Sequence, residues 1–479
     1  MKFGLIFALA AAAFDLTCAP AQAGSKPIMV HYMPWYVTPY SGAGWGWHWT
    51  MNHFDPNTTN ASGQSNIASW YYPSIGPYDS LDPDVLEYHV LLMKLAGIDG
   101  IIVDWYGMDT NVYDYGINNV RTAAIFSYAK RAGLKFSLCY EDSTIAAEIS
   151  GGFLAAKDAL THAQQTMLYA QSNYFIDGSF LRLGGKPLLL NFGPQYFTTN
   201  SGWVSIFSAL DAGNQPAFFT EDNRFPAGQG AFDWPPMSVS GGGTLTSNQL
   251  GGYLGAFEAR GKGWPAYVSS AFPRFHDIYA QAGVRPTYGY LDDNGGITFR
   301  QSLVRAFTND SAVVQLVTWN DFGEGTIIEP TAQYGCRDLG VVQDLRRQYI
   351  DAAFPCHTND LALASQIYTL RRHYGASAAV AAELDRAFTN IVAGKLATAS
   401  LQLAGIQSNT CVIYDVASTN RQIRFSIGGY LAGGARVDAS TNLSGAGWRT
   451  VSVLSPGTNQ PTFSTNAQAP AEFFKARQP

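Results

Sequence analysis

Short apolar runs alternate with segments of helical spacing along most of the chain, starting at Ile28. A short apolar run between turn residues is typical of a strand that is covered on both faces, as in a parallel sheet. Strands that alternate with helices predict βα units, and eight such units close a (β/α)8, or TIM, barrel. The predicted barrel strands are residues 28–32, 100–104, 135–140, 187–191, 216–220, 231–234, 264–268 and 313–318.

Helices are predicted between these strands, because apolar residues there recur at intervals of three and four. The clearest start is Asp82-Pro83, since Asp is a favoured N-cap and Pro is favoured at the first helical position. The predicted helices are residues 82–96, 117–132, 154–172, 203–211, 247–260, 296–308 and 339–353.

The pattern changes after the predicted barrel. Residues 361–374 and 378–403 are rich in Ala and Leu at helical spacing, which predicts a small helical subdomain over 358–407. From residue 408 the chain is rich in Thr, Ser, Gly and Val, which predicts a β-sandwich-like module over 408–479. Its predicted strands are 411–415, 422–427, 435–439, 449–454 and 472–476. We therefore expect a barrel domain over residues 24–357, followed by these two smaller parts.

Residues 1–23 have the pattern of a cleavable export signal. Lys2 precedes the apolar stretch 3–14, and Ala21-Gln-Ala23 is a small-residue cleavage site. We expect a secreted or periplasmic protein. A lipoprotein with Cys18 as its anchor is the alternative, but Asp15 and Thr17 fit that pattern badly. No later stretch has transmembrane length, and no basic cluster suggests a nucleic-acid partner.

The composition favours a protein that handles carbohydrate. Charged residues make up 14% of the chain, aromatic residues also 14%, and the formal net charge is −6. A typical soluble domain has about 25% charged residues. Aromatic rings stack on the C–H faces of sugars, while neutral polar groups bond to hydroxyls. We expect a monomer whose partner is a polysaccharide or oligosaccharide.

Each predicted strand ends in polar or aromatic residues, and in a parallel barrel these ends share the face that carries the active site. The last strand opens directly into Asp321 and Glu324, with Gly323 and Gly325 allowing a tight loop. Glycoside hydrolysis requires two carboxyl groups, one protonated and one ionised. We predict Asp321 and Glu324 as the catalytic pair. The predicted substrate contacts are Tyr32, Trp35, Trp47, His48, Trp49, Asp104, Trp105, Tyr106, Glu141, Asn191, Glu221, Asp233, Trp234, Arg274, Trp319, Asn320 and Glu329.

Structural interpretations compete with several of these assignments. Asp104 could cap a turn or pair with an arginine of the barrel, and the segment Trp47-His48-Trp49 could be a packed loop. A His between two Trp in a Gly-rich stretch is more easily explained by contact with a sugar. The acids are spread over different strand ends, and no His-rich motif such as His-x-x-x-His is present. The sequence therefore implies neither a metal nor a cofactor.

Three segments resemble known glycoside hydrolase families. Thr318-Trp-Asn-Asp-Phe-Gly-Glu324 is similar to a motif of family 71, the endo-α-1,3-glucanases. Three segments resemble family 99, the endo-α-mannosidases and mannanases. They are the continuation of this motif to Pro330, His31-Tyr-Met-Pro-Trp-Tyr36 and residues 97–107. Family 99 has Glu where this chain has Asp321. The resemblance covers about residues 26–357 and implies an endo-acting hydrolase with a (β/α)8 barrel.

The resemblance also implies roles for the acid pair. Glu324 corresponds to the general acid and Asp321 to its partner. In family 71 the partner serves an inverting mechanism, whereas in family 99 it assists the 2-hydroxyl of the sugar in a retaining one. Both routes remain open, as do α-glucan and α-mannan substrates. The alternative class is a carbohydrate-binding protein without catalysis, which retention of both acids disfavours.

The cysteines lie far apart in the sequence. Cys336 and Cys356 bracket a predicted helix and are the natural disulfide pair of an exported protein. Cys139 lies inside a predicted strand, and Cys411 lies in the C-terminal module. A bond between Cys139 and Cys411 is possible, but no feature of the sequence supports it.

Overall fold

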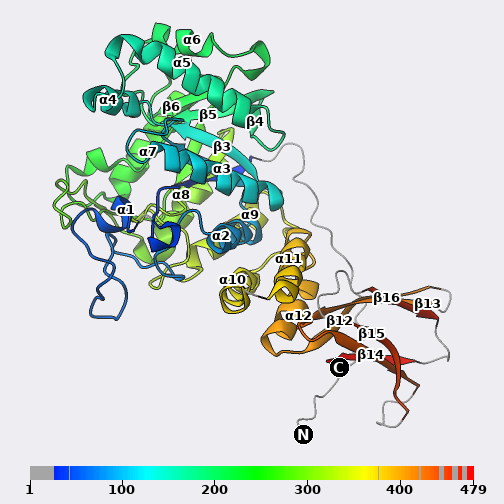
Figure 1. The fold of residues 1–479 in the computed structure, drawn as a ribbon. Helices are drawn as coiled ribbons and strands as arrows, with labels where there is room; N and C mark the ends of the chain where they lie inside the picture. The colour runs from blue at the N-terminus through cyan, green and yellow to red at the C-terminus, as the bar shows by residue number, and fades with distance from the viewer. Residues whose placement is uncertain are drawn as a thin grey trace. The chain divides into compact units, whose positions relative to one another are not determined.

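The computed structural model describes residues 26–42, 44–375, 377–419, 422–441, 447–455, 462–466 and 472–478. The chain divides between Tyr368 and Thr369 into two compact units (Figure 1). The predicted export signal, with Cys18, lies outside the described residues. Among the described helices, none combines the length and the apolar character that crossing a bilayer requires.

The first unit is a closed barrel of eight parallel strands. Each strand pairs with the next one along the chain, and the last pairs with the first through Ile28 and Val314. The inward and outward faces are both covered, so most strand residues are apolar. The predicted (β/α)8 barrel is confirmed. A two-residue strand, β4 (Arg182–Leu183), adds an antiparallel edge to β5. The barrel strands are β1 (Ile28–Tyr32), β2 (Gly100–Trp105), β3 (Lys135–Tyr140), β5 (Lys186–Asn191), β6 (Ala217–Glu221), β7 (Gly230–Phe232), β8 (Val268–Ala271) and β11 (Val313–Leu316).

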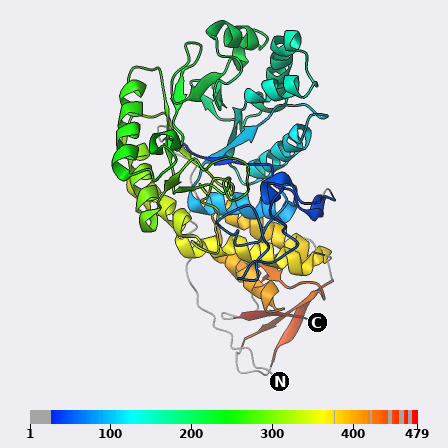
Figure 2. The same ribbon diagram turned by 90° about the vertical axis from the view of Figure 1, so that its left-hand side faces the viewer.

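Helices stand outside the ring of strands, as Figure 2 shows. The first long helix begins where the sequence predicts, because the Asp82 side chain accepts from the Asp84 amide, and it ends at Gly97 with a positive φ of 80°. A capping box of Thr246 and Gln249 lies at the start of the helix that begins at Ser247. The helices are α1 (Trp47–Thr50), α2 (Pro83–Ala96), α3 (Tyr115–Arg131), α4 (Ser143–Ser150), α5 (Ala159–Ala170), α6 (Asn200–Phe207), α7 (Ser247–Gly261), α8 (Ile297–Thr308) and α9 (Arg337–Tyr349).

The seventh barrel strand lies later in the chain than predicted. The apolar run 264–268 supplies outer packing instead: Trp264 contacts Phe257 and Tyr267, which are buried between α7 and the barrel. The strand itself is Val268-Ser-Ser-Ala271. Its serines are tolerated inside because the Ser270 amide and hydroxyl both donate to Asp233. Helix α4 was not predicted, and Trp47 to Thr50 form a short helix rather than an open loop.

The second unit combines helices with two three-stranded antiparallel sheets. Helix α10 (Ala362–Tyr374) crosses the boundary between the units, and α11 (Ala378–Val392) and α12 (Leu396–Gln407) follow it. The sheets share one apolar core around Phe425 and Val437, as expected of a sandwich. Their strands are β12 (Cys411–Thr419), β13 (Gln422–Gly429) and β16 (Thr462–Asn466) in one sheet, and β15 (Arg449–Leu454), β14 (Ala435–Ser440) and β17 (Phe473–Arg477) in the other.

The helices after residue 377 pack with the C-terminal strands. Glu383 of α11 is fully buried, and its Oε1 accepts from Gln402 of α12 at 3.0 Å and from the Gly429 amide at 2.8 Å. A buried carboxylate without these donors would be costly. The compact unit therefore includes both helices and strands, whereas the sequence analysis separated a helical subdomain at 358–407 from the β module.

The predicted Cys336–Cys356 disulfide does not form in this structure. Cys336 is the N-cap of α9, whereas the Cys356 carbonyl accepts from Arg347 near the other end of that helix. The segment after α9 returns along the helix, because the Thr358 hydroxyl donates to Gln343 at 3.2 Å. The sequence spacing therefore brings the two cysteines to the same helix without joining their sulfur atoms.

We expect truncation to separate the two units only at the observed boundary. A chain that ends after residue 375 keeps the barrel and α10, and it should unfold cooperatively and remain soluble. A chain that ends after residue 407 keeps α11 and α12 but removes the Gly429 donor from buried Glu383, so it should aggregate or bind a hydrophobic dye. Gel filtration and thermal unfolding of both chains provide the measurement. If the two truncated chains were equally soluble and unfolded equally cooperatively, the position of the boundary between the units would be wrong.

Candidate active site

The acid loop, residues 318–326, leaves the C-terminal end of β11 and is closed by its own backbone. The Thr318 amide donates to the Thr326 carbonyl at 2.6 Å, and the Asp321 amide donates to the Thr318 hydroxyl at 2.8 Å. Asp321 Oδ1 in turn accepts from the Glu324 amide at 2.9 Å. The loop therefore holds Asp321 and Glu324 in a fixed relation.

Gly325 is required where the loop turns back. Its φ is +71°, and a Cβ at this position would lie 2.8 Å from the His276 carbonyl oxygen and 2.9 Å from the Tyr71 ring. The His276 amide donates to the Glu324 carbonyl at 2.8 Å. The close approach that glycine permits thus joins the acid loop to the segment after β8.

A buried polar network fixes the loop on β1 and α2. Asn320 exchanges hydrogen bonds with the Met33 backbone at 2.8 and 3.0 Å and donates to the Tyr78 hydroxyl at 3.0 Å. Tyr78 donates to Glu329 at 2.7 Å, and Glu329 lies 3.3 Å from His89. Because these side chains are buried and contact one another, they position the acids without contacting solvent.

Two cavities meet at Glu324. The smaller cavity, of about 230 Å³, contains Asp321 and Glu324 together with Asp104 and Glu141. The larger cavity, of about 600 Å³, contains Glu324 with Glu221 and Asp222. Phe192, Trp234 and Glu324 line both cavities, so they form the junction between them.

The two acids of the loop differ in how their pKa values are shifted. Burial raises the pKa of Asp321 to about 6, while amide donors of the loop oppose the shift. Burial raises the pKa of Glu324 well above its ordinary value, and the neighbouring charge of Asp321 raises it further. The shifts therefore favour an ionised Asp321 beside a protonated Glu324, the division that acid and base roles require.

Tyr279 contacts the predicted general acid from the segment after β8. Its hydroxyl donates to Glu324 Oε1 at 3.5 Å. Burial and the nearby acids raise the pKa of Tyr279 far above its ordinary value, so the phenol remains a donor. A donor to the ionised form favours ionisation, so Tyr279 limits the rise in the pKa of Glu324.

An aromatic wall forms one side of the smaller cavity. Trp35 stacks on His48 with ring centroids 4.1 Å apart, and Trp47 meets His48 edge to face at 5.0 Å. Desolvation lowers the pKa of His48 to about 3, so the ring is neutral. Trp47 is 41% exposed, which leaves its face available to a sugar.

Part of the chain is similar to proteins of known family. The family model described as Glycosyl hydrolase family 99 matches residues 25–213. A zebrafish (Danio rerio) glycoprotein endo-alpha-1,2-mannosidase-like protein is 34% identical over 88 residues, which cover 16% of this chain and 20% of that protein. The rat (Rattus norvegicus) glycoprotein endo-alpha-1,2-mannosidase is 22% identical over 326 residues, which cover 62% of this chain and 66% of the rat protein.

The chain is similar to glycosyl hydrolase family 99 over residues 25–213. The endo-alpha-mannosidase of family 99 from Bacteroides thetaiotaomicron, in complex with Bis-Tris-propane, superposes with a TM-score of 0.52 at 17% identity. That match covers 68% of this chain and 98% of the bacterial one, and it shows a shared barrel fold. The chain spans about a fifth of the length of the first curated relatives that it matches.

The structure brings together ten of the residues predicted from the sequence of this family 99-like protein. Asp321 and Glu324 lie at the junction described above, and eight predicted contacts line the cavities. Those eight are Trp35, Trp47, His48, Asp104, Tyr106, Glu141, Glu221 and Trp234.

The other nine predicted contacts are almost fully buried and line neither cavity. Arg274, for example, donates to the Ile327 carbonyl at 2.6 Å and pairs with Asp338. A side chain without accessible surface cannot touch a substrate, so these nine support the site from beneath. They are Tyr32, Trp49, Trp105, Asn191, Asp233, Arg274, Trp319, Asn320 and Glu329.

Several cavity residues were not found by the sequence analysis. They include Tyr279, Tyr253 and Tyr288, which belong to α7 or to the segment after β8. Correct placement of the seventh strand would have marked the residues that follow it as site candidates. Tyr253 lies on a helix and gives no comparable signal, because only packing turns it towards Asp222, to which it donates at 3.0 Å.

We expect Trp47 and Trp49 to respond differently to replacement by Ala. Trp47→Ala removes an exposed platform and should raise KM about two- to ten-fold, since an aromatic contact contributes about 0.5–1.5 kcal/mol. Trp49 is fully buried, and its indole donates to the Tyr78 carbonyl at 2.8 Å. Trp49→Ala should therefore destabilise the fold by about 3–5 kcal/mol. Steady-state kinetics and denaturant unfolding measure the two effects, and a common response would contradict this division.

Tyr279→Phe should move only one limb of the pH–rate profile. The wild-type rate should rise through about pH 6 as Asp321 ionises and fall at higher pH as Glu324 loses its proton. Loss of the Tyr279 donor raises the pKa of Glu324, so the basic limb should move to higher pH. Tyr288→Phe is the matched control, because Tyr288 contacts Arg285 rather than Glu324. Identical basic limbs in wild type and Tyr279→Phe would rule out the contact.

Proposed function

We propose that this family 99-like protein is an endo-acting glycoside hydrolase that cleaves α-glycosidic bonds of a polysaccharide. The observation that carries the proposal is the position of Glu324 at the junction of two cavities, with Asp321 in only the smaller one. A glycosidic bond that crosses this junction would have the general acid beside its oxygen. Sugar units on both sides would then be bound, as internal cleavage requires.

The two acids supply the chemistry that hydrolysis needs. Protonated Glu324 donates its proton to the departing glycosidic oxygen, and the C–O bond breaks as positive charge develops on the sugar ring. Ionised Asp321 accepts a proton from the attacking group. The shifted pKa values support this division, because burial raises the pKa of Glu324 well above its ordinary value and that of Asp321 only to about 6.

The smaller cavity suits the sugar whose anomeric carbon is attacked. It holds Asp321 and the wall of Trp35, His48 and Trp47, so one sugar would meet acids on one side and rings on the other. The larger cavity suits the leaving part of the glycan, because Tyr253, Phe275 and Tyr288 offer further aromatic surface there. Its volume of about 600 Å³ accommodates more than one sugar unit.

Similarity to proteins named endo-alpha-mannosidases supports an α-mannan-type substrate, with α-glucan as the alternative from the family 71 motif. The same similarity favours a route in which Asp321 assists the 2-hydroxyl of the sugar, so that the first product keeps its configuration. Direct activation of water by Asp321 would invert it. The predicted export signal, which lies outside the described residues, supports action on glycans outside the cytoplasm.

Replacement of the two acids should have different effects on two kinds of substrate. Glu324→Gln cannot donate a proton, so the kcat on a natural α-glycan should fall by about 10²–10⁴-fold, the usual contribution of general acid catalysis. A glycosyl fluoride needs little protonation of its leaving group and should be hydrolysed much closer to the wild-type rate. Asp321→Asn should slow both substrates, because the attacking group needs its base in each case.

The measurement is single-substrate kinetics on α-mannan and on a matching fluoride, with proton NMR of the first product. Asp222→Asn is a control acid, since it lines the larger cavity but pairs with Arg260 at 2.8 Å. Binding of glycan without new reducing ends in the wild type would support the carbohydrate-binding alternative. Near-full activity of both Glu324→Gln and Asp321→Asn would show that the acid loop is structural.

A further inference from the structure

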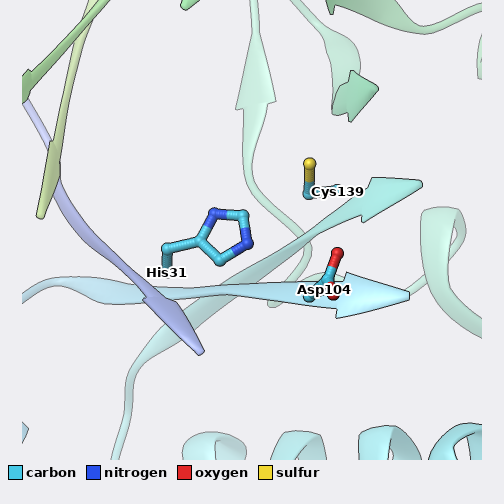
Figure 3. A group of neighbouring side chains, drawn as sticks. All are labelled: His31, Asp104 and Cys139. Carbon is cyan, nitrogen blue, oxygen red and sulfur yellow. The ribbon is translucent and has the colours of Figure 1, made fainter. Parts of the chain in front are cut away.

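Three potential metal ligands converge inside the barrel from consecutive strands. His31 comes from β1, Asp104 from β2 and Cys139 from β3, and Figure 3 shows the three side chains next to one another. One ligand atom of each lies within 4.8 Å of the other two. A tetrahedral zinc site with bonds of about 2.0–2.3 Å places its ligands about 3–4 Å apart, so small side-chain movements would close the set.

Within the cluster, Asp104 lacks the internal partners that buried polar groups normally have. Asp104 is 4% exposed, and its carboxylate forms no hydrogen bond or ion pair with the part of the chain that the structure describes. Cys139 is fully buried beside it. A buried carboxylate that receives no donor is costly and points to a missing partner.

The surrounding charge also favours a cation. Among the described residues, neither cavity is lined by a lysine or an arginine. The histidines do not compensate, because desolvation lowers the pKa of both His31 and His48 to about 3 and leaves them neutral. The acids that line the cavities are Asp104, Glu141, Glu221, Asp222, Asp321 and Glu324, of which Asp222 is paired with Arg260.

We propose that His31, Asp104 and Cys139 bind one divalent cation of the zinc class. A set of one imidazole, one carboxylate and one thiolate suits zinc, whereas magnesium and calcium prefer oxygen ligands alone. Three protein ligands leave a coordination position open. His31 and Asp104 line the smaller cavity, so that position faces the space assigned to the sugar.

Binding exchanges protons for the cation. Burial and the adjacent acids raise the pKa of Cys139, so the sulfur is a thiol in the metal-free protein, and they raise the pKa of Asp104 towards the protonated carboxyl. On binding, the S–H bond of Cys139 and the O–H bond of protonated Asp104 break, the protons leave to solvent, and sulfur–metal and oxygen–metal bonds form. His31 is already neutral and presents a lone pair without losing a proton.

The second group of possible ligands in this chain does not support the same inference. Asp109, Glu148 and His162 also lie close together, but His162 already contacts both carboxylates at 2.9 and 3.2 Å. Those ion pairs satisfy the group without a metal. This cluster therefore serves as an internal control for adventitious binding.

Titration of the metal-free, purified chain with Co²⁺ alone tests the site. A cysteinate ligand produces a sulfur-to-cobalt charge-transfer band in the near ultraviolet, which we expect to saturate at one cobalt per chain. Cys139→Ser should abolish the band while leaving the circular dichroism spectrum and the Tm close to wild type. Asp104→Asn should keep the band but weaken cobalt binding by about 10-fold or more.

Cys336→Ser, Cys411→Ser and His162→Asn are the matched controls, and each should keep the band. Absence of a band in wild type at equimolar cobalt would overturn the proposal. So would a band that survives Cys139→Ser or disappears in one of the controls. If Cys139→Ser fails to fold, loss of tight cobalt binding in His31→Asn supports the site and its retention overturns it. The readout uses no substrate, so its outcome is independent of the hydrolase proposal.

Discussion

The active face depends on one buried polar network that joins the acid loop to β1 and α2. Asn320, Tyr78, Glu329 and His89 have almost no solvent contact and are connected by distances between 2.7 and 3.3 Å. Such groups are costly to bury unless each finds its partner, so the network forms only when all of its elements are in register. The requirement gives the loop a single arrangement. Asp321 and Glu324 then point into the cavities because their supports cannot be placed otherwise.

A second constraint is the excess of negative charge above the strands. The acids of the smaller cavity raise the pKa values of one another, with burial as the larger cause for Asp104, Glu141 and Glu324. The folded protein therefore holds protons that these groups would lose in water, and the associated stability is fully present below their ordinary pKa values and is lost as pH rises through their shifted pKa values. A protonated carboxyl is what a general acid requires. The same excess of charge is what a bound cation at His31, Asp104 and Cys139 would offset.

Aromatic residues are divided between the site and its support by burial alone. Trp47 and Trp49 are two positions apart in one short helix, yet Trp47 is 41% exposed and Trp49 is fully buried. Trp49 packs against Tyr36 at 4.2 Å and Phe322 at 5.2 Å, so it stiffens the acid loop from below. The proposed platform for sugar and the scaffold of the loop thus come from the same segment. Residue type cannot separate these roles, because an indole suits both.

The sequence by itself predicted the barrel, which the structure confirms, and placed the proposed acid pair after its last strand. Apolar runs at regular spacing require a sheet that is covered on both sides, and polar residues after each run mark the carboxyl ends of its strands. Only the tertiary structure decided which of those residues are accessible. Glu329 and Asn320 follow the same strand as Glu324, but partners more than two hundred positions earlier draw them into the interior. It also decided the seventh strand, because Ser270 is stable there only with Asp233 beside it. The local sequence pattern indicates whether a residue suits a buried strand. Hydrogen bonds between polar groups that are distant in the sequence form only in the folded chain.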